Sequence, residues 1–143
     1  MVNIHHNIKM KIFTLLVLLI TGLSTFGQKK QVCFSFDDLP VVSYGITDQG
    51  YQKNLMNKLI LSWKKNKIPA IGFVNEIKLF EDGSMSSFQF GLLKSWINNG
   101  LDLGNHTYSH SDYNTTTFKD YSKDILKGET VTKKILKGKG KND

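Results

Sequence analysis

An α/β fold built on a parallel sheet or barrel is predicted from three features of this 143-residue chain. Short apolar segments at 31–36, 70–74 and 101–104 have the length and composition of buried strands. Segments with the spacing of amphipathic helices separate these strands and follow the last one. Because strands and helices alternate along the chain, we expect parallel strands that are covered by helices.

The first two predicted strands flank one long helix. QVCFSF at 31–36 is rich in β-branched and aromatic residues and gives way to a polar loop at Asp37. A helix is predicted over 48–67, because its apolar residues fall on one helical face. These residues are Tyr51, Leu55, Met56, Leu59, Ile60 and Trp63. Pro69 ends the helix, and AIGFV at 70–74 forms the second strand.

The second half of the chain repeats this pattern. Residues 81–87 are small or turn-forming and predict a loop. A helical stripe follows, formed by Leu92, Leu93, Trp96 and Ile97. Gly100 is expected to stop this helix before a third strand at 101–104, and one or two helices are expected over 117–137. Both tryptophans lie on helical stripes and are expected to pack in the core.

The N-terminus has the layout of a signal peptide. Lys9 and Lys11 precede an apolar run, IFTLLVLLI at 12–20, which small and polar residues follow. The run is shorter than the ~20 residues that span a bilayer, so no stable membrane span is expected after cleavage. We predict a signal peptide at 1–27, a mature start near Gln28, and a secreted or periplasmic location.

Composition narrows the function classes. Beyond residue 27 the chain has 17 lysines against 12 acidic residues, a net charge of +5, and it contains no arginine. Without that bidentate donor, specific nucleic-acid recognition is poorly supported. The lysine- and glycine-rich end, 133–143, is expected to be a solvated tail; contact with an anionic polymer is the alternative. Cys33 is the sole cysteine, which excludes an intramolecular disulfide, and its apolar neighbours predict a buried thiol.

Four residues at the ends of predicted strands suggest a metal site. Asp37 and Asp38 follow the first strand, whereas His106 and His110 follow the third. The carboxyl ends of parallel strands face the same way, so these side chains can converge although 68 positions separate Asp38 from His106. Two histidines and one carboxylate would leave open positions for water and substrate, which suits amide or ester hydrolysis. The other carboxylate would be free as a base.

A helical metalloprotease motif is excluded by a single residue. In H-E-x-x-H proteases a glutamate follows the first histidine on a helix, whereas here Thr107 holds that position. Tyr108 and Tyr113 flank the histidines and are expected either to pack the loop or to stack on a sugar ring. Asp112 is expected to cap the turn that follows it, with support of the metal site as the alternative.

Three motifs resemble the polysaccharide deacetylases of the NodB-homology type: SFDDLP at 35–40, AIGFVNE at 70–76 and GLDLGNHTYSH at 100–110. The resemblance implies a distorted (β/α) barrel and a divalent metal, usually zinc. Asp38, His106 and His110 would hold this metal, and Asp37 would be the general base. The substrate would be an acetylated carbohydrate carrying N- or O-linked acetyl groups. A backbone N–H near Tyr108 would stabilise the tetrahedral oxyanion that forms when water attacks the acetyl carbonyl. Tyr108 itself is a candidate substrate-binding residue.

The resemblance covers only the first part of such a domain. Family members have Gly where Leu39 stands, and their later motifs supply an arginine for the base and a histidine as general acid, which have no counterpart here. Residues 28–143 number 116, about half of the roughly 200 to 250 that an eight-unit barrel needs. We therefore expect a partial (β/α) barrel at 28–132, incomplete at its C-terminus, with impaired activity on its own. A non-catalytic carbohydrate- or metal-binding remnant and a phosphoesterase remain alternatives.

Overall fold

The computed structural model describes residues 8, 10–17, 30 and 32–140. The chain divides into two units, Met1–Gln31 and Val32–Asp143. Residues 10–17 of the first unit are helical, whereas the predicted cleavage site before Gln28 lies outside the described residues. Within the described part of the chain, no helix has both the length and the apolar character that a bilayer crossing requires.

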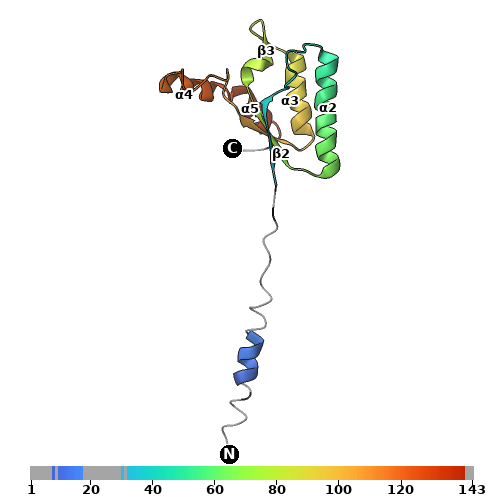
Figure 1. Ribbon diagram of the computed structural model, residues 1–143, viewed down its shortest axis with the longest axis vertical. Coiled ribbons are helices and arrows are strands. Elements are labelled where there is room, and N and C mark those ends of the chain that lie inside the picture. Colours follow the sequence, from blue (N-terminus) through green and yellow to red (C-terminus); the bar gives the residue numbers. More distant parts are fainter. Residues whose placement is uncertain (1–7, 9, 18–29, 31, 141–143) are drawn as a thin grey trace, which may run out of the picture. The chain divides into compact units, whose positions relative to one another are not determined.

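A three-stranded parallel sheet organises the second unit (Figure 1). Strand β2, Ala70–Val74, is central and pairs with β1, Phe34–Leu39, on one side and with β5, Asp102–Asn105, on the other. The predicted α/β class and the parallel strands are confirmed. These strands form an open sheet within the described residues, which is the partial barrel that the sequence predicts.

Helices α2, Gln49–Asn66, and α3, Ser87–Asn98, lie side by side in Figure 1 and contact each other. Their tryptophans meet edge to face with ring centroids 5.4 Å apart. Trp96 is fully buried and donates its indole N–H to the Asp102 carbonyl at 2.7 Å, so the predicted core role of this side chain is confirmed. The side chain of Asp48 caps α2, and Gly100, with φ at +83°, follows α3 as predicted.

Several local predictions are wrong in detail. Strand β1 runs from Phe34 to Leu39 instead of over 31–36, which leaves Cys33 exposed beyond the start of the sheet. The predicted loop at 81–87 contains all but the first residue of a small hairpin, formed by β3, Phe80–Glu81, and β4, Ser84–Met85. An Asp-Gly pair with positive φ at both residues makes its turn, which is a recognised hairpin signal.

Two helices close the described chain, as expected: α4, Phe118–Lys127, and α5, Thr130–Lys137. Helix α5 buries Val131 and Ile135, so the first residues of the predicted tail at 133–143 belong to the folded unit. The N-cap residue of α5, Glu129, makes no side-chain capping hydrogen bond at the start of the helix. Instead, the carboxylate of Glu76 accepts the N–H groups of Val131 and Thr132 at 2.6–3.0 Å.

Candidate metal centre

The aspartate pair lies in an irregularity of β1. Phe36 pairs with Gly72 and Leu39 pairs with Val74, so two residues of β1 stand opposite one residue of β2. Asp38 has φ at +65°, a left-handed conformation that is uncommon outside glycine. Such bulges redirect side chains and are frequent beside functional sites. The structure therefore extends the strand through the residues where the sequence predicted a loop.

The histidine loop, residues 105–111, begins where β5 ends. The N–H of His106 still bonds the Val74 carbonyl at 3.0 Å, and the Asn75 amide donates to the His106 carbonyl. Thr107 and His110 both have positive φ, at +64° and +58°. The Thr107 hydroxyl accepts the His110 N–H at 3.0 Å. Local hydrogen bonds thus turn the loop back so that its two imidazoles approach each other.

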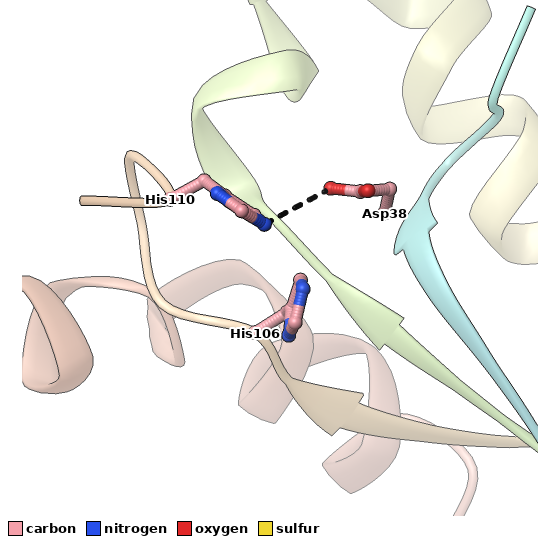
Figure 2. Close-up of side chains that lie close together, drawn as sticks. All are labelled: Asp38, His106 and His110. Carbon is pink, nitrogen blue, oxygen red and sulfur yellow. Dashed lines mark ion pairs between the residues drawn. The ribbon is translucent and has the colours of Figure 1, made fainter. Parts of the chain in front are cut away.

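Asp38, His106 and His110 come together at the carboxyl ends of β1 and β5 (Figure 2). One ligand atom from each side chain lies within 4.8 Å of the others, and His110 Nε2 is 3.8 Å from Asp38 Oδ1. The two imidazole rings meet edge to face with centroids 5.0 Å apart. Convergence across 68 positions of sequence is therefore present in the structure.

This arrangement fits a divalent metal. An ion held at about 2.0–2.2 Å from two ligand atoms requires those atoms to lie within about 4.4 Å of each other. The separation of His110 and Asp38, 3.8 Å, meets this limit, and separations up to 4.8 Å need only a small side-chain rotation. Two imidazoles and one carboxylate are a donor set that suits zinc and leaves coordination positions open.

A lysine also reaches this carboxylate. Lys78 lies on the 3₁₀ helix η1, Glu76–Leu79, and its ammonium is 3.1 Å from Asp38 Oδ1 and 3.1 Å from the Asp38 carbonyl oxygen. Both side chains are more than a third exposed. The sequence contains no signal that would have assigned Lys78 to the site, because it follows the second strand in a stretch without a motif.

Asp37 does not join this group. It is exposed and lines a cavity of about 390 Å³ between β1 and α2. The other lining residues include Phe36, Val41, Tyr51 and Met56. Of the two neighbouring carboxylates, only that of Asp38 belongs to the cluster of potential metal ligands. The predicted role of Asp37 as general base stays a prediction.

Tyr108 has structural contacts on both its backbone and its ring. Its N–H, one of the backbone donors in the region where an oxyanion donor is expected, donates to the Asp124 carbonyl at 3.1 Å. The ring packs near Phe80 and lies 3.5 Å beneath the ammonium of Lys127. These residues line a further cavity of about 300 Å³, in which the ring can still contact a ligand.

Asp124 on α4 holds the middle of the histidine loop. Its carboxylate accepts the N–H of Ser109 at 3.0 Å and the hydroxyl of Ser109 at 2.9 Å. Partial burial opposes ionisation, but these bonds outweigh it and hold the pKa of Asp124 below its usual value. Asp112, by contrast, accepts the Asn114 N–H at 2.9 Å and closes its own turn, as expected.

The comparisons with known proteins agree with this fold. A family model described as polysaccharide deacetylase matches residues 26–141. The chain belongs to the polysaccharide deacetylase family. No curated protein sequence matches it.

Solved structures with the same fold include three deacetylases of 22–23% sequence identity. The Bc1960 peptidoglycan N-acetylglucosamine deacetylase is 22% identical, with a TM-score of 0.54 over 73% of this chain and 41% of that one. The chitin deacetylase from the fungal pathogen Colletotrichum lindemuthianum is 22% identical, with a TM-score of 0.53 over 73% and 40%. The peptidoglycan deacetylase PdaC from Bacillus subtilis is 23% identical, with a TM-score of 0.54 over 75% and 45%. The chain thus spans less than half the length of these proteins.

Proposed function

We propose that the chain carries the metal-binding part of a hydrolase that removes N- or O-linked acetyl groups from a carbohydrate. The main support is the convergence of Asp38, His106 and His110 at two strand ends, in a member of the polysaccharide deacetylase family. The metal is proposed to be zinc, which the donor set favours. A signal peptide at 1–27 and export from the cytoplasm are part of the same proposal.

The residues of the site divide the chemistry between them. A divalent ion bound there would supply Lewis acidity toward the acetyl carbonyl and acidify a water molecule. Asp38, His106 and His110 would hold the ion, and Asp37 would accept the proton of the attacking water. Tyr108 would contact the sugar through its ring. His106 and His110 are the only histidines of residues 28–143, so no other histidine within these residues could protonate a leaving amine.

Metal binding is the first test. The purified chain should bind one equivalent of zinc, measured by isothermal titration calorimetry and by elemental analysis after dialysis. Asp38→Ala should abolish this binding, whereas Asp112→Ala, which removes a nearby carboxylate with a turn-closing role, should not. Zinc that binds equally well to both variants would place the ion elsewhere and contradict the proposed site.

Acetate release separates the catalytic hypothesis from its alternatives. We expect release from O-acetylated sugars to exceed release from N-acetylglucosamine oligomers, because an alkoxide departs with less need of an acid than an amine does. Zinc binding without acetate release from either substrate class would favour the non-catalytic binding protein. A phosphoesterase lacks support here, since the chain has no arginine for phosphate, and hydrolysis of a model phosphate ester would revive it.

A further inference from the structure

Lys78 is the residue whose contacts the proposed function leaves unexplained. Its ammonium bonds the Asp38 carboxylate and the Asp38 carbonyl, each at 3.1 Å. We propose that Lys78 is a tethered cation that occupies the Asp38 carboxylate in the metal-free protein and lowers the affinity of the site for its metal. This inference rests on the proposed function, since it assumes that Asp38 is a metal ligand.

The backbone around Lys78 is anchored to the histidine loop and to helix α5. The preceding residue, Ile77, donates its N–H to the Tyr108 carbonyl at 3.0 Å in the histidine loop. Glu76, which is 1% exposed, caps helix α5. Lys78 N–H bonds the Asn75 carbonyl at 3.1 Å. Because hydrogen bonds on both preceding residues anchor this turn, we expect the side chain of Lys78, and not its backbone, to move when another cation approaches Asp38.

Geometry places the ammonium and a metal close together. Lys78 Nζ is 3.1 Å and His110 Nε2 is 3.8 Å from the same oxygen, Asp38 Oδ1. An ion about 2.2 Å from that oxygen would lie no more than about 5.3 Å from the ammonium. The repulsion of a single and a double positive charge at this distance weakens binding about tenfold even with the full dielectric screening of water.

The ammonium can avoid this repulsion by swinging into solvent. Its side chain is 39% exposed, so that path is open. The ion pair with Asp38 is then lost, and exposed ion pairs contribute little, equivalent to about fivefold at most. Whether the ammonium stays or leaves, the affinity of the site for zinc is lowered, either by repulsion or by the loss of the ion pair. Because the smaller of the two costs applies, replacement by a neutral side chain is expected to strengthen zinc binding by up to about fivefold.

The opposite role would give the opposite sign. If Lys78 positioned Asp38 for the metal, through its bond to the Asp38 carbonyl, its removal would weaken binding. If the ion pair were a surface contact of no consequence, removal would change nothing. The direction of the change in zinc affinity thus separates the three roles.

The experiment compares zinc dissociation constants by competition with a chromophoric chelator, at fixed pH and ionic strength, with the full chain. Lys78→Met and Lys78→Gln remove the charge and should bind zinc more tightly, by up to about fivefold. Lys78→Arg keeps the charge and should stay within about twofold of the parent. Lys58→Met makes the same change of net charge on an exposed face of α2 and is the matched control.

Equal or weaker binding by both neutral variants, in proteins with the far-ultraviolet circular dichroism of the parent, would overturn the inference alone. Tighter binding by Lys58→Met as well would also overturn it, because the effect would then reflect net charge. Absence of zinc binding in every protein, the parent included, would overturn the proposed function and this inference with it.

Discussion

The histidine loop and the aspartate pair reach the same site by different means. Every N–H from His106 to His110 has an acceptor, supplied by β2, by the loop itself or by α4. Asp38 sits in a bulge of a strand at the edge of the described sheet, and the side-chain contacts of its carboxylate come from Lys78 and His110. Asp37 is exposed. The fold thus fixes the histidine loop through its backbone, whereas the Asp38 carboxylate is contacted by the exposed side chains of Lys78 and His110.

The largest effect is expected when a proposed metal ligand is removed from the histidine loop. His106→Ala should weaken zinc binding by about 100-fold or more, since even supporting groups around metal ligands contribute 10- to 100-fold. Asp37→Asn should leave the affinity within about threefold, because Asp37 lies outside the cluster of potential ligands. Calorimetric titration of both variants measures the contrast. Equal losses in the two variants would mean that Asp37 also holds the metal.

Gly128 offers a way to disturb the histidine loop without touching a ligand. A methyl group at this position would lie 2.4 Å from the carbonyl carbon of Thr107 and 2.5 Å from the Tyr108 nitrogen, which are backbone atoms. Gly128→Ala should therefore cost about 3 kcal/mol of unfolding free energy, the upper end for overpacking, and weaken zinc binding.

Gly91→Ala is the matched control for that experiment. The added methyl group would meet nothing within 4 Å, and the position lies within α3. Alanine should be neutral or stabilise the chain by up to about 1 kcal/mol. Urea unfolding measures both variants. If Gly128→Ala proves as stable as Gly91→Ala and keeps its zinc affinity, the close contact between α4 and the histidine loop does not fix the site.

The buried carboxylate of Glu76 joins η1 to the start of helix α5. Glu76→Gln keeps the shape but leaves one oxygen to accept the N–H groups of Val131 and Thr132, and it buries a surplus amide. We expect a loss of about 2 kcal/mol in unfolding free energy, the usual cost of an unsatisfied buried group. Glu81→Gln, on the exposed hairpin, is the control and should be neutral. Equal stability of the two variants would argue against capping by Glu76.

Sequence reasoning recovered the parts of the site that depend on strand order. Two polar segments after parallel strands must meet at one edge of a sheet, so the aspartate pair could be brought to His106 and His110 from strand order, but strand order did not choose Asp38 over Asp37. The core tryptophans followed from helical periodicity in the same way. Both inferences use only local pattern and the direction of strands.

The remaining contacts of the site join residues that no periodicity relates. Lys78 reaches back 40 positions to Asp38, and Glu76 reaches forward 55 positions to α5. The irregularity of β1 at Asp37 and Asp38 depends on strand register, which the sequence does not reveal. The bond from the Tyr108 N–H to the Asp124 carbonyl likewise depends on the packing of α4, which no local pattern predicts.

The smallest effect concerns the charge on Asp124. Partial burial raises the pKa of Asp124, but the hydrogen bonds from Ser109 lower it by more. The pKa in the folded protein therefore lies below the ordinary value of about 3.9. A depressed acid contributes stability that is present above that value and is lost as the pH falls through the folded pKa. The carboxylate is partly exposed, so solvent screening limits the contribution to about 0.5 kcal/mol.

Asp124→Asn should therefore lower the unfolding free energy by about 0.5 kcal/mol at pH 7 and by less below pH 3, where the parent carboxylate is protonated. Urea unfolding at several pH values measures the difference. Asp82→Asn, in the exposed hairpin turn, should follow the parent throughout. A difference that grows as the pH falls would reverse the sign of the linkage. In that case the charge of Asp124 would not stabilise the histidine loop. The contrast between a histidine loop fixed by the fold and an Asp38 carboxylate contacted by exposed side chains would then be weaker.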